Sequence, residues 1–534
     1  MAGNHKHMFG KVFPINSLPG SSLVSTGMDR IHNDAAIKYD ATRKYYEKVD
    51  ADILFCFSDI AIQAEAMGAR VNIPRDAMPS ILETAKSIHE PNPSKCERMR
   101  VNSEVVRALK SCFREKSISA VIYGPFTVAG QLIGEQAALK KVVNNPEEVS
   151  GVLSRTFRVA LAYADYMLNS GADVLWVSDP LAALLPPDCF EEFAGKYLAR
   201  LFSSFSSVPS VIHICGDTSE LLPQIVQTGP DAISFDQCMD LLLVEDGVPD
   251  EVFIMGNIDP SEVMEQSDLE TVEEEVSDQA HIMGAVQNYI MSTGCALPPS
   301  TPIENVQAFI SAARKVLGAI EDEAAPLNEI RSAVFEGDEE RANTLTKNIC
   351  DQVNIPVNIL IKAGLMRSVR KGSVWYEAKR KFLPDILLMA EAFYAGYSNL
   401  RLHTLDTEHE GTEVVVGAVK GDYHEIGKDL VKIFLEINGF RVLDLGVDVL
   451  PEDFISAAVS NRGSVIGVSI FVTSCRSQLK KIIEEIHRQG LKDIAIVAGG
   501  AAVNRSIVFD QGADGYARDA VEAVSVINRL YKRL

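Results

Sequence analysis

Cysteine and histidine side chains follow two apolar segments at spacings that suit a metal site. His213 and Cys215 end the segment PSVIHICG, and Cys295 ends the segment NYIMSTGC. Residues two apart on a strand point to the same face. One imidazole and two thiolates make a zinc ligand set with a position left for water or substrate, so we predict a catalytic zinc site. The alternative is ordinary core packing, because cysteine is among the most buried residue types.

Two thiolates would neutralise the charge of a zinc ion, which leaves it a poor Lewis acid for hydrolysis. Such an ion still holds an incoming thiol as its thiolate. The thiolate is the nucleophilic form, and a free thiol with a pKa of about 8.5 is mostly protonated at neutral pH. The ligand set therefore favours attack by a thiolate over hydrolysis.

A second polar group lies in the stretch GDYHEIGKDL, where Asp422 and His424 stand on a loop bounded by Gly421 and Gly427. A phosphate-binding loop is excluded because the glycine spacing is one residue too long and Asp429 replaces the required hydroxyl. Two interpretations remain from the residues alone. His424 is either a solvated histidine of a structural loop, or a metal ligand whose other ring nitrogen is held by a carboxylate.

The elements that must position these residues alternate between short apolar strands and longer helical patterns, which predicts α/β architecture. The strands expected in the first 320 residues are SAVIYG from Ser119, ADVLWVSD from Ala172, PSVIHICG from Pro209, DAISFD from Asp231, VFIMGNID from Val252 and NYIMSTGC from Asn288. Their number and spacing favour a barrel, in which chemistry gathers at the carboxyl ends of the strands.

Two further sequence patterns follow along the chain. Residues 325–400 carry apolar positions at helical spacing without a strand, which predicts a unit of four helices. The polar stretch RLHTLDTEHEGTE is the expected linker. The last 125 residues return to alternation, with five expected strands in EVVVGAV, FRVLDLG, VIGVSIFV, IAIVAGGAA and DGYAR. Short, nearly continuous apolar strands indicate a small, doubly wound parallel sheet.

The bulk composition limits the partners and the compartment. The 534 residues carry a formal net charge of −22, which argues against nucleic acid as the main partner. The sequence contains neither a secretion-like apolar segment at its start nor a run of about 20 apolar residues that could span a membrane. Nine cysteines without disulfide-like spacing suit a reducing compartment, so we predict a cytoplasmic protein.

The first 320 residues resemble the uroporphyrinogen decarboxylase superfamily, a TIM (β/α)8 barrel, through YGPFTVAGQLIG, SGADVLWVSDPLA, HICGD, GNIDP and GCALPPSTPIENVQAF. The H-x-C pair with a distant cysteine resembles the branch of zinc methyltransferases that act between a corrinoid and a thiol such as coenzyme M. That resemblance implies catalytic and zinc-binding roles for His213, Cys215 and Cys295, with Asp236 as a fourth ligand. The absence of arginine before Arg30 argues against porphyrinogen decarboxylation.

The stretch from Asp422 resembles the D-x-H-x-x-G motif of the cobalamin-binding domain of methionine synthase and of methanogen-type corrinoid proteins, a Rossmann-like fold. The resemblance implies that His424 is the axial ligand of cobalt, Asp422 its proton-linked partner and Gly427 a close-approach residue. The third member of that relay would fall at Ser474 or Cys475. Further contacts to the cofactor are implied for Ser469, Thr473, Gly499 and Gly500, and for Trp375 in the helical unit, which resembles the cap over the corrinoid.

Taken together, the sequence predicts a methyltransferase barrel (1–322), a helical cobalamin cap (323–402) and a cobalamin-binding domain (403–534) in one chain. Its cofactors would be cobalamin and zinc, and its substrates a small methyl donor or a thiol acceptor. Expected partners are a separate methyltransferase and a protein that reductively activates the corrinoid. The alternatives are direct demethylation of chloromethane, a non-catalytic cobalamin sensor, or a porphyrinogen decarboxylase.

Overall fold

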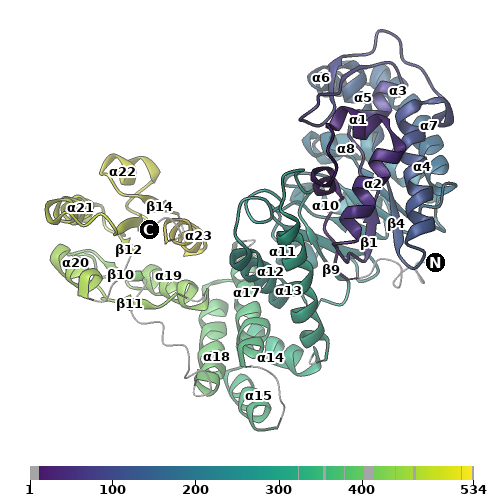
Figure 1. Cartoon of the computed structure of the whole chain (residues 1–534). Helices are drawn as coiled ribbons and strands as arrows, with labels where there is room; N and C mark the ends of the chain where they lie inside the picture. Colours follow the sequence, from purple (N-terminus) through teal and green to yellow (C-terminus); the bar gives the residue numbers. More distant parts are fainter. Residues whose placement is uncertain are drawn as a thin grey trace. The chain divides into compact units, whose positions relative to one another are not determined.

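The computed structural model describes residues 11–284, 286–322, 324–352, 357–377, 379–401, 414–438, 440–460, 465–518 and 520–531 (Figure 1). Contacts divide the chain into two compact units, Met1–Ala324 and Ala325–Leu534. Among the helices in these ranges, none combines the length and the apolar character needed to cross a membrane.

The first unit is built on a parallel sheet with the strand order β1-β4-β5-β6-β7-β8-β9. The strands are β1 (Ile53–Phe55), β4 (Ser117–Tyr123), β5 (Val174–Ser178), β6 (Ser210–His213), β7 (Ala232–Ser234), β8 (Phe253–Ile258) and β9 (Tyr289–Thr293). Val12 forms a parallel bridge with Met291 of β9, and its carbonyl accepts a hydrogen bond from the Asp52 amide just before β1. The sheet therefore curls into the predicted barrel, with the segment around Val12 between its first and last strands.

Thirteen α-helices lie among the described residues of the first unit, and β2 (Arg70–Asn72) and β3 (Ser80–Glu83) form a separate antiparallel hairpin. The helices are α1 (Met28–Asn33), α2 (Ala35–Tyr46), α3 (Ile62–Ala66), α4 (Glu97–Cys112), α5 (Pro125–Ile133), α6 (Glu135–Asn144), α7 (Pro146–Leu168), α8 (Pro187–Phe190), α9 (Lys196–Ser204), α10 (Leu222–Gln227), α11 (Leu241–Glu245), α12 (Leu269–Met283) and α13 (Ile303–Asp322). Proline opens α7, where its missing N–H costs nothing, and two glutamates follow it at the positive end of the helix dipole.

The register of the barrel strands aligns one row of residues at their carboxyl ends. Tyr123 of β4 pairs with Ser178 of β5, and Ser178 pairs with His213 of β6. His213 in turn pairs with Ser234 of β7. Neighbours in register point to the same face of a sheet, so these four side chains share one layer of the barrel interior. Trp176, two residues before Ser178, lies fully buried in the layer below.

The second unit begins with the predicted helical unit. Its helices are α14 (Ala324–Glu336), α15 (Glu339–Gln352), α16 (Val357–Ile359), α17 (Arg367–Glu377) and α18 (Leu383–Arg401). A π-helical stretch, Leu360–Met366, joins α16 to α17 into one continuous helical segment. With α14, α15 and α18, the unit therefore contains four helical segments, as predicted. The predicted linker and the expected domain boundary at residues 402–403 lie outside the described residues.

The rest of the second unit is a parallel sheet with the order β11-β10-β12-β13-β14, which confirms the predicted doubly wound arrangement (Figure 1). Its elements are β10 (Val414–Ala418), α19 (Ile426–Ile437), β11 (Val442–Asp444), α20 (Pro451–Ser460), β12 (Val465–Ser469), α21 (Ser477–Gln489), β13 (Ala495–Gly499), α22 (Arg505–Asp510), β14 (Gly515–Ala517) and α23 (Ala520–Tyr531). Helices α20, α21 and α22 pack on one face, and α19 and α23 on the other. Burial on both faces explains why these strands are continuously apolar.

Candidate functional site

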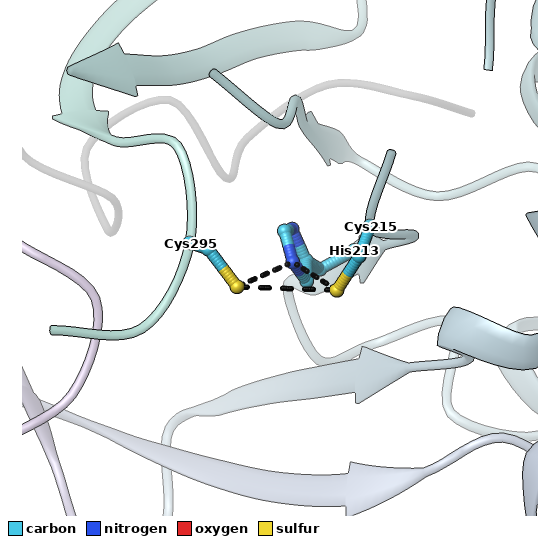
Figure 2. A group of neighbouring side chains, drawn as sticks. All are labelled: His213, Cys215 and Cys295. Carbon is cyan, nitrogen blue, oxygen red and sulfur yellow. Dashed lines mark hydrogen bonds between the residues drawn. The ribbon is translucent and has the colours of Figure 1, made fainter. Parts of the chain in front are cut away.

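The structure brings the predicted zinc ligands together at the carboxyl ends of β6 and β9. The Cys215 sulfur lies 3.2 Å from His213 Nε2, and the Cys295 sulfur lies 3.5 Å from the same nitrogen. The two sulfurs are 3.9 Å apart. Figure 2 shows the three side chains pointing toward one another, with Cys295 approaching from the side opposite His213 and Cys215.

These separations fit a tetrahedral zinc site. With Zn–S bonds of about 2.3 Å and Zn–N bonds of about 2.0 Å, the edges of a tetrahedron are about 3.8 Å between sulfurs and about 3.5 Å between nitrogen and sulfur. The observed separations of 3.9, 3.5 and 3.2 Å lie close to these values. Among the described residues these three form the one group of His, Cys, Asp or Glu with ligand atoms this close together.

The orientation of His213 is set by β7. Its Nδ1 lies 3.1 Å from the Ser234 hydroxyl and 3.3 Å from the Ser234 carbonyl, so Nε2 faces the two sulfurs. Such partners on the far nitrogen fix the ring of a metal-binding histidine. Sequence reasoning missed Ser234, because its only signal is a serine at the end of an expected strand.

The electrostatics of the cluster favour a thiolate on one cysteine. A hydrogen bond from Cys215 and the charge of His213 lower the pKa of Cys295 to about 4, against the effect of burial. The hydrogen bond to Cys295 and burial raise the pKa of Cys215. Burial alone would lower the pKa of His213, but the charge of Cys295 raises it. The site thus stabilises negative charge on sulfur before any ion is considered.

Asp236 lies beside the cluster but outside the group of ligand atoms. One of its carboxylate oxygens accepts a hydrogen bond from the Gly216 amide at 2.9 Å, and the other accepts one from the Cys238 amide at 3.1 Å. These bonds tie the loop that follows Cys215 to the loop that follows β7. Asp236 as a fourth zinc ligand therefore stays a prediction.

The second predicted site is the loop after β10. The side chain of Asp422 is fully buried, and one of its oxygens lies 2.9 Å from His424 Nδ1 and 3.1 Å from the His424 amide. Although burial alone would raise the pKa of Asp422, hydrogen bonds from the Phe471 amide and from His424 hold it below its usual value. With Nδ1 committed to a carboxylate, Nε2 is the nitrogen that can bind a metal.

Asp448, which sequence reasoning missed, fixes the same loop from the turn that follows the neighbouring strand β11. Its carboxylate accepts a hydrogen bond from the Gly421 amide at 2.7 Å and pairs with Lys420 at 2.6 Å. Its own amide donates to the Asp422 carbonyl at 2.9 Å. Asp448 adopts a φ of 58°, a conformation that non-glycine residues rarely occupy. Asp448 therefore holds the first residues of the loop that carries His424.

The second oxygen of Asp422 is bonded to the backbone. The amides of Phe471 and Val472 donate to it at 2.5 and 3.2 Å. Among the described residues, neither Ser474 nor Cys475, the predicted third members of the relay, is a partner of this carboxylate. The Phe471 ring instead stacks on His424, with ring centroids 4.1 Å apart.

The glycines of this domain differ in what surrounds them. Gly427, in the first turn of α19, is exposed, and a side chain there would meet nothing within 4 Å, so its role as a close-approach residue stays a prediction. Gly499 and Gly500 are needed by the fold itself, because a Cβ would lie 2.5 Å from the Ala517 carbonyl oxygen and 2.4 Å from the Ile470 carbonyl oxygen, respectively.

The remaining predicted cofactor contacts lie in the same unit. Ser469 ends β12 in register with Gly499, and Thr473 opens the short turn that follows, so both lie at the sheet edge that carries His424. Trp375 stands near the end of α17, where its ring packs edge-on against Phe335 with centroids 5.0 Å apart. Helix α18 is joined to α19 by a hydrogen bond from Tyr394 to Glu436.

Comparison with known proteins assigns a family to each part. Residues 22–316 match the family described as uroporphyrinogen decarboxylase (URO-D), and residues 412–525 match the B12 binding domain. The chain is 24% identical over 328 residues to the methylcobamide:CoM methyltransferase MtaA of Methanosarcina barkeri, covering 56% of this chain and 93% of the relative. It is 29% identical over 211 residues to the corrinoid protein DSY3155 of Desulfitobacterium hafniense, covering 38% of this chain and 96% of that protein.

A solved methyltransferase from Methanosarcina mazei has the same barrel fold, with a TM-score of 0.52, 20% identity, and coverage of 57% of this chain and 92% of that one. The two family matches and the named relatives together support a corrinoid-dependent methyltransferase. The chain belongs to the uroporphyrinogen decarboxylase family and carries a B12 binding domain that follows its barrel in the sequence.

Proposed function

We propose that this chain moves a methyl group between a small methyl compound or thiol, held at zinc in the barrel, and a corrinoid carried by its own last domain. The cluster of His213, Cys215 and Cys295 carries the proposal, because its spacing fits zinc and its three side chains leave one of four ligand positions open. When bound, zinc holds a thiol as its thiolate, and the corrinoid supplies a cobalt centre that exchanges methyl groups.

The side chains divide the work between the two sites. Ser234 orients His213, so that the imidazole presents Nε2 to the metal position. Asp422 holds Nδ1 of His424 and thereby presents its Nε2 at the edge of the last sheet. Joining the two sites in one chain raises the effective concentration of the carrier at the barrel to the order of mM for a short linker.

The test is methylation of the carried corrinoid. The full chain is loaded with zinc and cobalamin, reduced, and mixed with methanol, methylamine, methanethiol, methyl chloride or a methoxylated aromatic. We expect one donor to consume the absorbance of the reduced cofactor, and the Cys295→Ala variant to leave it unchanged. A chain that reacts with none of these donors, and that passes no methyl group to a thiol in the reverse direction, would disprove the proposal.

Two glycine substitutions separate cofactor contact from folding. Gly427→Ala places a methyl group in open space at the start of a helix, where alanine is favoured by about 0.5–1 kcal/mol. We expect this variant to resist urea slightly better than the wild type, yet to bind cobalamin more weakly. Gly500 has a φ of 116° and no room for a Cβ, so Gly500→Ala should lower the free energy of unfolding by about 2 kcal/mol or more.

Urea unfolding and equilibrium dialysis with cobalamin measure the two effects. Unchanged cobalamin affinity in Gly427→Ala would show that the cofactor does not approach α19 at this residue.

A further inference from the structure

A second polar surface lies in the barrel interior, in the same layer as His213. The register places Tyr123 of β4 and Ser178 of β5 in the row that continues to His213 of β6. Neighbouring strands lie about 4.8 Å apart, so the backbones of Tyr123 and His213, two strands from each other, are separated by about 10 Å across the sheet. A molecule of a few heavy atoms bound at the thiolate cluster would therefore meet both hydroxyl groups.

Both hydroxyls are free to bind such a molecule. Among the described residues, neither the Tyr123 phenol nor the Ser178 hydroxyl has a hydrogen-bond partner, and both side chains are only partly buried. Burial raises the pKa of the Tyr123 phenol well above its usual value, and the negative charges of Asp59 and Cys295 add to the effect. The phenol therefore keeps its proton and lies within electrostatic reach of the cluster.

The position of Tyr123 is held by a side chain from outside the sheet. Gln63 of α3 is fully buried and donates to the Tyr123 carbonyl at 3.0 Å. Its amide oxygen accepts a hydrogen bond from the Tyr123 N–H at 2.6 Å. A residue held by two backbone hydrogen bonds, with a phenol that has no internal partner, has the features of a binding residue.

The floor below these hydroxyls is apolar. Trp176 is buried in the next interior layer, where its ring contacts Phe13 and Phe55 edge-on and lies tilted to the His213 ring, with centroids 6.4 Å apart. An aromatic floor beside a polar wall suits a methyl compound that carries one polar head.

The charge around the cluster defines that head further. No Lys or Arg occurs between Arg200 and Arg314, the stretch that supplies β6 to β9 and all three predicted zinc ligands. On the β1 side, Lys38 is buried and donates to Asn102. Arg98 is buried between Asp59 and Glu65. The part of the barrel that holds the cluster thus provides no lysine or arginine side chain.

We propose that Tyr123 and Ser178 form the substrate-head subsite of the cluster, and that it accepts a neutral or cationic head in preference to a sulfonate or carboxylate. This inference rests on the proposed function, because it takes the cluster to be where the substrate binds. The two hydroxyls donate to or accept from a hydroxyl or amino group. An anionic head would lose water beside strands β6 to β9, which supply no lysine or arginine to compensate its charge.

Calorimetry of the zinc-loaded full chain with four thiols tests the subsite without relying on methyl transfer. The probes are propanethiol, 2-mercaptoethanol, cysteamine and 2-mercaptoethanesulfonate, which share a short chain and differ at the head. We expect 2-mercaptoethanol and cysteamine to bind at least tenfold more tightly than the sulfonate. Tyr123→Phe and Ser178→Ala should each weaken 2-mercaptoethanol by about three- to tenfold and leave propanethiol unchanged.

Ser203→Ala, on the exposed end of α9, is the matched control, and zinc content and thermal unfolding should be unaltered in all three variants. Tightest binding of the sulfonate, wild-type affinity for 2-mercaptoethanol in both variants, or no binding of any thiol would overturn the subsite. If one of these binding results is obtained and the wild-type chain still transfers a methyl group, the subsite is wrong and the proposed function stands. Failure of the subsite is thus distinguishable from failure of the proposed function.

Discussion

Replacing Cys295 with alanine should abolish stoichiometric zinc binding and methyl transfer while leaving cobalamin binding intact. The substitution removes one of three ligand atoms that lie within 3.2–3.9 Å of one another. Loss of an outer partner of a metal ligand commonly costs 10- to 100-fold in affinity, so loss of a ligand itself should cost more than about 100-fold. His213→Ala should behave in the same way.

Elemental analysis after dialysis against a chelator measures the effect, and a graded series sharpens it. Ser234→Ala leaves all three ligands in place but removes the hydroxyl partner of His213 Nδ1 and keeps only the Ser234 carbonyl, so its zinc affinity should fall between those of the wild type and of Cys295→Ala. Cys238→Ala is the matched control, because this thiol is exposed and lies outside the ligand group. A full equivalent of zinc and full turnover in both Cys295→Ala and His213→Ala would refute the metal site.

Replacing His424 with alanine should preserve the fold and the binding of cobalamin but change the absorbance spectrum of the bound cofactor and slow methyl transfer by orders of magnitude. The side chain of His424 is 53% exposed, so its removal costs little packing. What is lost is the only imidazole on the loop that Asp422 and Asp448 hold in place. The spectrum reports directly whether this imidazole binds the metal.

The control for this variant is His487→Ala, which removes an exposed histidine in the last turn of α21. Its spectrum and turnover should equal those of the wild type. An unaltered spectrum in His424→Ala, at full cobalamin occupancy, would rule out axial ligation by His424 and would leave the histidine as a solvated loop residue.

The sequence predicts most of the strands because they are apolar runs bounded by turns or helices. β1 was not predicted, since Ile53–Phe55 is too short to show a period, and the β2–β3 hairpin has largely exposed strands. The alternation of the last 125 residues was easier to interpret, because buried parallel strands are continuously apolar.

The residues of the candidate site also differ in whether a local sequence pattern could predict them. His213 and Cys215 could be paired from sequence because residues two apart on a strand share a face. Tyr123 and Ser178 could not, because the relation between β4, β5 and β6 depends on register between strands, which no local pattern carries. The partners of Asp422 were missed for a different reason, since backbone amides leave no trace in residue type.

The side-chain amide of Gln63 replaces a neighbouring strand at Tyr123. It forms hydrogen bonds with both the N–H and the C=O of that residue, as an adjacent strand does elsewhere in the barrel. β1 ends at Phe55, so residues 56–61 are released from the register of the sheet while β4 remains anchored. The barrel therefore closes over a first strand of only three residues, because one buried glutamine completes the hydrogen bonds of β4 beyond the end of β1.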